Sequence, residues 1–336
     1  MYLTPREAKL LVRFLDCVDD VVTARLLPDA SVDERHLTSL LRETLDERFT
    51  GFHAMPYGLA ALKDDLEKDD LATKVSLTIE ANEYPPHFEN RVTQADLGII
   101  LRYDNSYRRD ESFSKAVLFQ AKRIVPSSRH SSYSERDAFK RLETDQLRQI
   151  IDLEGRHSRF IYYLFYGPRA EAYDEQSRRT LRYLTLPTTH WRHLHRFHSP
   201  EGYEFLPWWS HLEEYASDPK RHFPGLLASR PGWLEQRYFE RQETDNGKSN
   251  RLVLRPKQSA PTVRDVYERM WEDTHALSWF LVYRMLMGYE GSSDDEAIGI
   301  AQGKRLELGV APRYTMELRI SVGAEGQGWI PPDKPL

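Results

Sequence analysis

The stretch ADLGIILRYDNSYRRDESFSKAVLFQAKR, residues 95–123, contains two apolar segments joined by a polar connection. The segments 95–103 and 115–123 are rich in β-branched and aromatic residues, which favours two strands. KVSLTIEA at residues 74–81 alternates with period two, and it predicts another strand before them. Because consecutive strands with short connections usually pair, the three are predicted to form an antiparallel meander.

Helices and a fourth strand are predicted around this meander. The sequence from Ser31 to Glu34 has the spacing of a capping box, and it predicts a helix over 31–45. Apolar residues at helical spacing predict a second helix over about 133–153, and RFIYYLFYG at 159–167 predicts a fourth strand. The order of these elements predicts an α/β core with a mixed central sheet flanked by helices: a helix, three strands, a helix and a strand.

Outside this core, helical spacing predicts a long helix over 263–287, and YTMELRISV at 314–322 predicts a last strand. Further helices are predicted over 5–27 and 59–70. We expect the C-terminal half to be an α-rich extension that supplies substrate contacts, a docking surface for a protein partner, or a homo-oligomer interface. The N-terminal packing helix, the core and the α+β C-terminal extension are assigned to residues 1–30, 31–172 and 173–336.

The composition is that of a folded protein. Of the 336 residues, 40% are hydrophobic and 29% are charged, which excludes a disordered or collagen-like chain. Cys17 is the only cysteine, so neither an intramolecular disulfide nor a thiolate zinc site can form, and we expect a reducing, cytoplasmic location. Every apolar run is too short or too charged to cross a bilayer, so we expect no membrane partner.

The net charge of −5 is unevenly distributed. Residues 1–100 carry 11 basic and 19 acidic side chains, whereas residues 101–200 carry 19 basic and 12 acidic ones. The basic block predicts an anionic partner on one face, although solvated helix faces would give the same count. The arginines that we assign to contacts with phosphates are Arg102, Arg108, Arg109, Arg123 and Arg129.

Three polar residues are expected to meet at one end of the predicted hairpin. Asp96 lies at the start of one strand, and Gln120 and Lys122 lie at the end of the next, so antiparallel pairing makes them neighbours. Gln120 and Lys122 are two residues apart and leave the same face of the sheet. Oxygen ligands suit Mg²⁺ or Mn²⁺, and a nearby lysine would orient an attacking water and stabilise negative charge.

These residues and the order of the elements resemble the restriction-endonuclease-like superfamily, the PD-(D/E)XK nucleases, over residues 31–170. The resemblance implies that Asp96 and Gln120 are metal ligands and that Lys122 is the catalytic lysine. Gln120 departs from the usual acid, and a neutral amide is a weaker ligand. Ala95 stands where many members have proline. A metal-dependent endonuclease acting on DNA is implied, similar to nuclease subunits of bacterial anti-phage defence.

The resemblance also implies a metal-binding and catalytic glutamate. The site would lie near the beginning of the preceding helix, which favours Glu34 over Glu43. Glu34 is also the capping-box partner of Ser31, and that role alone would account for it. Glu80 and Glu89 are further candidates.

Two alternatives to an active nuclease stay open. A buried Asp–Lys pair in an unrelated α/β domain would produce the same pattern, and a nuclease-like module with weak or no activity would bind nucleic acid or a partner protein. Four histidines between His190 and His198 suggest a basic-aromatic surface more than a zinc site, since no cysteine or carboxylate accompanies them.

Overall fold

The computed structural model describes most of the chain. The described residues are 3–27, 32–49, 51, 53–68, 74–84, 95–126, 132–185, 223–243, 250–254, 260–288, 290–304 and 312–323. The histidine-rich segment 190–198, together with Ser31, Glu89 and Arg129, therefore lies outside the described residues.

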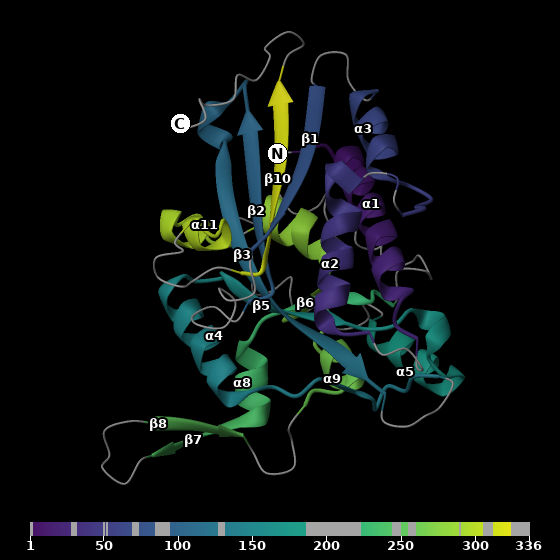
Figure 1. Ribbon diagram of the computed structural model, residues 1–336, viewed down its shortest axis with the longest axis vertical. Coiled ribbons are helices and arrows are strands. Elements are labelled where there is room, and N and C mark those ends of the chain that lie inside the picture. Colours follow the sequence, from purple (N-terminus) through teal and green to yellow (C-terminus); the bar gives the residue numbers. More distant parts are fainter. Residues whose placement is uncertain are drawn as a thin grey trace, which may run out of the picture.

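The described strands form one mixed sheet of eight strands and a separate two-stranded ribbon. The strands are β1 (Lys74–Glu83), β2 (Leu97–Asn105), β3 (Phe113–Val125), β4 (Ala138–Phe139), β5 (Ile161–Tyr166), β6 (Leu226–Ser229), β7 (Phe239–Glu243), β8 (Asn250–Leu254), β9 (Thr274–Ala276) and β10 (Tyr314–Gly323). The large sheet has the order β1-β10-β2-β3-β5-β6-β9, with β4 paired to β3, and β7 pairs with β8 in the ribbon (Figure 1).

Helices of different lengths cover this sheet. They are α1 (Pro5–Thr23), α2 (Glu34–Leu45), η1 (Glu47–Phe49), α3 (Leu59–Glu67), η3 (Arg109–Glu111), α4 (Thr144–Arg156), η4 (Ala170–Ala172), α5 (Glu175–Thr185), α8 (Gly232–Tyr238), α9 (Val263–Tyr267), α10 (Leu277–Trp279), the π-helix η6 (Phe280–Leu286) and α11 (Asp295–Ala301). None of the helices in the described ranges combines the length and apolarity needed to cross a bilayer.

The central strand pairing differs from the predicted meander. β10 lies between β1 and β2, antiparallel to β1 and parallel to β2, with Tyr314 opposite both Glu83 and Leu97 (Figure 1). Only β2 and β3 form the expected antiparallel pair, with Leu97 opposite Phe119. Alternation of apolar residues identifies a strand but not its neighbour, so the sequence pattern could not reveal that a distant strand is inserted.

Strands from both halves of the chain share the sheet. β6, β9 and β10 come from residues 173–336. β10 pairs with β1 and β2, and β6 pairs with β5, whereas β9 pairs with β6 at the edge of the sheet. β5 is parallel to β3 and antiparallel to β6. The fold is therefore an α/β arrangement with a mixed sheet, and the C-terminal half supplies part of its centre.

Two predicted helices are shorter in the structure. The helix predicted over 133–153 begins at Thr144, because β4 in its first part pairs with the end of β3. The helix predicted over 263–287 is interrupted: Trp271 has φ +74°, a left-handed conformation that no helix interior tolerates, and β9 then pairs with β6. The remaining helices α1, α2 and α3 agree with the prediction within a few residues.

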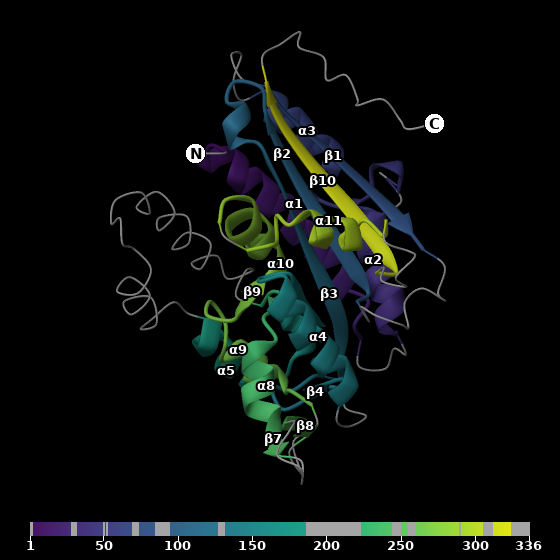
Figure 2. The ribbon, with the colours of Figure 1, turned by 90° about the vertical axis from the view of Figure 1, so that its left-hand side faces the viewer.

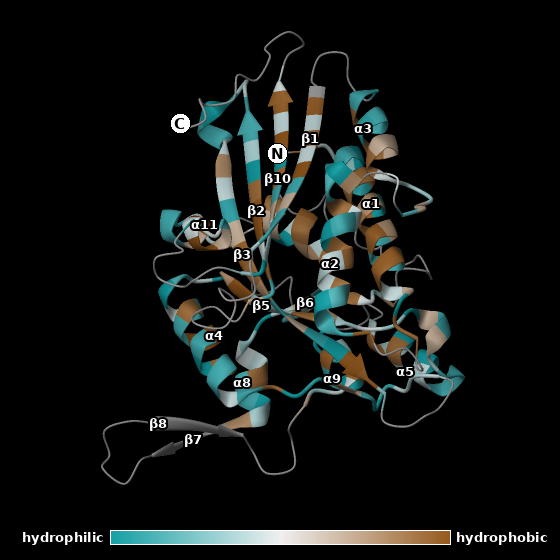
Figure 3. Cartoon of the chain, in the orientation of Figure 1, coloured by the Kyte–Doolittle hydropathy of each residue, from teal (hydrophilic) through white to brown (hydrophobic). Residues whose placement is uncertain are grey.

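The helices pack on the sheet from several sides. α2 packs on β1, β10 and β3, whereas α11 packs on β2 and β3, and α4 packs on β5. Figure 2 shows the molecule from the side of α4 and α11. In Figure 3 the first part of β2 is hydrophobic and its other end is hydrophilic, while α2 and α4 carry residues of both kinds. β5 is buried along its whole length, as expected for a strand covered on both faces.

Candidate active site

Asp96 is held at the start of β2 by backbone bonds on both sides. Its amide donates to the Phe119 carbonyl of β3 at 2.8 Å, and its carbonyl accepts from the Tyr314 amide of β10 at 3.1 Å. The carboxylate oxygen Oδ2 accepts from the Ala121 amide at 2.7 Å. Asp96 is only 8% exposed, so burial and this hydrogen bond together hold its carboxylate beside β3 at the start of β2.

Gln120 lies beside Asp96, as the predicted hairpin requires. Its amide Nε2 donates to Asp96 Oδ2 at 2.5 Å and also approaches the Ala121 carbonyl at 3.4 Å. The amide oxygen Oε1 is buried and accepts no hydrogen bond from any described residue. A buried acceptor without a donor is unfavourable by about 1 to 3 kcal/mol, so this oxygen is suited to a cation or to a donor brought by a ligand.

Lys122 leaves the same face of β3 as Gln120 and is 5% exposed. Burial lowers the pKa of Lys122, because an ammonium loses hydration there, and the charges of Asp96 and Glu34 only partly oppose this effect. Lowering the pKa makes the neutral amine more accessible near physiological pH. A lysine in this state is suited to exchange a proton with a water molecule.

Glu34 is the first residue of α2 and is 8% exposed. Its Oε2 lies 2.8 Å from the Lys140 ammonium, and its Oε1 accepts from the Arg123 amide at 3.4 Å. The side chain that caps this helix is Asp33, which accepts from the His36 amide at 2.7 Å. The side chain of Glu34 therefore reaches the end of β3, where its charge acts on Lys122.

The alternative glutamates lie elsewhere or outside the described residues. Glu43 is nine positions further along α2, about 13 Å from Glu34, and it pairs with Arg42. Glu80 is exposed on β1 and lies opposite Glu317 of β10, so a whole strand separates it from Asp96. Of the glutamates singled out from the sequence, Glu34 is the one that the structure brings to Lys122 among the described residues.

The predicted phosphate-binding arginines do not form one surface. Arg102 pairs with Glu317 at 2.7 Å, six residues along β2 from Asp96 and thus about 20 Å away. Arg108 pairs with Glu111 beyond the far end of β2, and the exposed Arg109 follows it in η3. Of the members of this set that the structure describes, Arg123 adjoins the candidate site, where its backbone amide donates to Glu34. β2 runs away from the site, which sequence proximity does not reveal.

Three residues near the site are not identifiable from the sequence. Lys140 pairs with Glu34, and the charge of Glu143, before the first turn of α4, acts on Lys122. Tyr166 of β5 is buried, and its hydroxyl lies 3.0 Å from the Thr38 hydroxyl of α2. No local sequence signal marks these residues. Residues 138–143 approach β3 because β4 pairs with it, whereas the sequence predicts a helix there.

Asp96, Gln120, Lys122 and Glu34 therefore meet at one end of the sheet; we call this group the Asp96–Lys122 site. Comparison of the chain with family models, with curated proteins and with solved structures gives no match in any of the three.

Proposed function

We propose that the protein is a metal-dependent endonuclease that hydrolyses DNA phosphodiester bonds at the Asp96–Lys122 site. The observation that supports this most is the convergence of a fixed carboxylate, an unpartnered amide oxygen and a buried lysine with a lowered pKa. Perturbed titratable groups beside unsatisfied polar atoms are typical of catalytic sites. A domain that only needed stability would gain little from burying such a lysine.

The residues of the site fit Mg²⁺ or Mn²⁺. Asp96, Glu34 and the Oε1 atom of Gln120 would hold the cation, since hard divalent cations take oxygen ligands, and Oε1 is a buried acceptor that lacks a donor. When bound, the cation would supply positive charge for the scissile phosphate and for the attacking water. Two carboxylates and one amide form a modest ligand set, so a substrate phosphate would complete it.

Lys122 would orient the attacking water and exchange a proton with it, since burial lowers the pKa of its ammonium. In its charged form it would also stabilise the negative charge that develops on the phosphate. Lys140 is 57% exposed although it pairs with Glu34, so it can turn to a phosphate oxygen without losing buried contacts.

The substrate and the biological role are proposed by analogy. DNA follows from the resemblance to PD-(D/E)XK nucleases, and so does a role as an effector of bacterial anti-phage defence in the cytoplasm. Partner binding or homo-oligomerisation would use the C-terminal half outside the strands that complete the sheet.

A second candidate function is a nuclease-like module that binds nucleic acid or a partner protein without cleaving it. One observation favours it: the amide of Gln120 already satisfies Asp96 Oδ2 with a hydrogen bond of 2.5 Å. A carboxylate at position 120 would repel Asp96 unless a cation lay between them. The amide of Gln120 is neutral and donates to Asp96, so the pair is favourable without a cation. This candidate predicts DNA binding that EDTA does not alter.

The two functions separate in one experiment. Purified protein is incubated with plasmid and linear DNA in Mg²⁺, Mn²⁺ or EDTA, alongside the variants Asp96→Ala and Lys122→Met, and DNA binding is measured in parallel. Metal-dependent cleavage that both variants lose supports the nuclease. Binding without cleavage in every metal, unchanged in both variants, supports the binding module and refutes the nuclease.

A further inference from the structure

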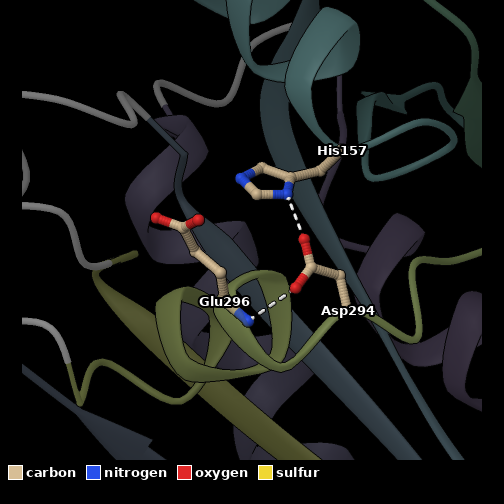
Figure 4. Close-up of side chains that lie close together, drawn as sticks. All are labelled: His157, Asp294 and Glu296. Atoms are coloured by element: carbon tan, nitrogen blue, oxygen red, sulfur yellow. Dashed lines mark hydrogen bonds and ion pairs between the residues drawn. The ribbon is translucent and has the colours of Figure 1, made fainter.

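A second group of ligand-type side chains lies outside the Asp96–Lys122 site. His157 follows the last turn of α4, Asp294 precedes α11, and Glu296 lies in the first turn of α11. One ligand atom from each residue lies within 4.8 Å of the others. We call these three residues the His157 cluster. Figure 4 shows their side chains, with the imidazole and both carboxylates gathered around one space.

The imidazole of His157 is oriented by direct contacts. Its Nδ1 lies 2.8 Å from Asp294 Oδ2, and its ring meets Phe160 edge to face. Asp294 Oδ1 accepts from the backbone amide of Glu296 at 2.9 Å, which holds the Asp294 carboxylate at the start of α11 (Figure 4). His157 is 6% exposed, whereas Asp294 and Glu296 are more open to solvent. The cluster is thus a buried nitrogen ligand facing two accessible oxygen ligands.

The segment that carries Asp294 is anchored to the body of the protein on three sides. The Gly291 amide donates to the Arg159 carbonyl at 3.0 Å, and Ser292 exchanges two backbone bonds with Ala116 of β3 at 2.8 and 2.9 Å. Glu290 is buried and pairs with Arg230 and with Arg284. Because ligands must be positioned before a metal arrives, this anchoring favours a preformed site.

The surroundings leave room for exogenous ligands. A groove of about 530 Å³ is lined by Arg156–Arg159 on one side and by Gly291–Asp294 on the other. The carbonyl end of α4 lies beside it and favours a cation, whereas the amide end of α11, which carries Asp294 and Glu296, opposes one. Arg156 and Arg159 oppose a bare cation, so an anionic co-ligand in the groove would lie between them and a bound metal.

From this arrangement we propose that His157, Asp294 and Glu296 bind Zn²⁺. One imidazole nitrogen with two carboxylate oxygens suits a borderline divalent metal, whereas Mg²⁺ prefers oxygen ligands alone. Three protein ligands leave a fourth position toward the groove. The bound ion would join α4 to α11, two elements that lie 137 residues apart at this point. The site is separate from the Asp96–Lys122 site, since His157 and Glu143 lie at opposite ends of α4, about 20 Å apart.

The test measures Zn²⁺ binding by the full chain after removal of metals with a chelator, using calorimetry with Zn²⁺ alone. The variants are His157→Gln and Glu296→Gln. Asp295→Asn is the matched control, because it removes an exposed carboxylate from the same turn without removing a ligand. We expect each ligand variant to lose at least tenfold in affinity for one equivalent of Zn²⁺, and we expect Asp295→Asn and Asp96→Ala to retain it.

The histidines at 190–198 are a second possible source of zinc binding, so a His193→Ala/His195→Ala variant is included. Zinc binding that this variant loses and Glu296→Gln keeps would overturn the proposal. His157 is buried, so His157→Gln carries the greater risk of not folding. Glu296 is partly exposed, so Glu296→Gln decides the test if His157→Gln does not fold. If Glu296→Gln and His157→Gln both fold and both keep the Zn²⁺ affinity of the natural protein, the proposed zinc site is refuted.

Discussion

The side-chain amide of Gln120 donates a 2.5 Å hydrogen bond to the Asp96 carboxylate, joining two residues that are 24 positions apart. The Ala121 amide donates to the same carboxylate oxygen at 2.7 Å. This oxygen therefore receives two donors from β3, while the other end of the Gln120 amide faces inward without one. The pair satisfies the Asp96 carboxylate oxygen and leaves the amide oxygen of Gln120 buried without a donor among the described residues.

Replacing Gln120 with glutamate changes this balance. Gln120→Glu would place two carboxylates within hydrogen-bonding distance, so one of them must take up a proton or repel the other. In EDTA at pH 8 we expect a loss of about 1 to 3 kcal/mol in the free energy of unfolding. Mn²⁺ should restore more stability to this variant than to the natural protein, as thermal unfolding with and without metal would measure.

Gln146→Glu is the control for burial of a new acid. Gln146 is 7% exposed on α4, and its amide oxygen also lacks a partner, but unlike Gln120 its amide donates no hydrogen bond to a carboxylate of the described residues. It should lose stability without recovering it in Mn²⁺. Equal recovery in both variants would mean that the metal acts elsewhere.

Lys122→Met should separate activity from stability. We expect cleavage to fall by about 10² to 10⁴-fold, the usual range for a lost proton-transfer group. The free energy of unfolding at pH 7 should stay the same or rise, because burial lowers the pKa of Lys122 and thus disfavours its charged form. The unfolded chain binds more protons between the lowered pKa and the ordinary one, so the advantage of the variant should shrink as pH rises through that window.

Lys115→Met provides the comparison on the same strand. Lys115 is partly buried, and its ammonium donates to the carbonyls of Met285 at 2.9 Å and Gly288 at 2.6 Å. Its loss should lower the unfolding temperature and leave cleavage within a few-fold of normal. If Lys122→Met lost stability as Lys115→Met does and kept its cleavage rate, Lys122 would be a structural lysine.

The sequence predicts strands better than it predicts their neighbours. Residues 74–81, 95–103, 115–123, 159–167 and 314–322 all correspond to strands, because alternation and β-branched content are local properties. The insertion of β10 between β1 and β2 depends on which apolar edges fit together in three dimensions. Likewise, the break at Trp271 follows from the pairing of β9 with β6, which no local pattern encodes.

The same distinction applies to the site. Asp96, Gln120 and Lys122 can be grouped because a hairpin alone brings them together, and that hairpin is present. The interactions of Lys140 and Glu143 depend on tertiary packing after β4. Arg102 lies on β2, whereas Arg108 and Arg109 lie beyond its end at η3, so charge counted by sequence does not locate a surface.

The stability of the protein should also depend on Asp19. This α1 residue accepts backbone bonds from Gly225 at 3.0 Å and from Leu226 at 3.1 Å, and burial raises its pKa to about 7, with Asp16 and Asp20 adding to the effect. Between about pH 4 and pH 7 the native state binds the extra proton, so stability should fall as pH rises through this range.

Urea unfolding at pH 5 and pH 8 would measure this dependence. From pH 5 to pH 8, the free energy of unfolding should fall by about 2 kcal/mol more in the natural protein than in Asp19→Asn. The side chain of Asp19 is partly exposed, and solvent screening makes the difference smaller than full burial would give. Asp20→Asn, at the exposed neighbouring position, should keep most of the natural dependence. Parallel curves for the natural protein and Asp19→Asn would contradict the assignment.

Gly98 should be essential for the packing of α11 on β2. A Cβ atom at this position would lie 2.7 Å from the Ala301 carbonyl oxygen and 2.9 Å from Pro312 Cγ, so Gly98→Ala must push α11 or its connection to β10 away. We expect a loss of about 1 to 3 kcal/mol, measured by urea unfolding. Gly155→Ala is the opposite case, since Gly155 lies within α4 with no atom within 4 Å of an added Cβ, and it should gain about 0.5 to 1 kcal/mol. Equal effects of the two substitutions would show that α11 does not rest closely on β2.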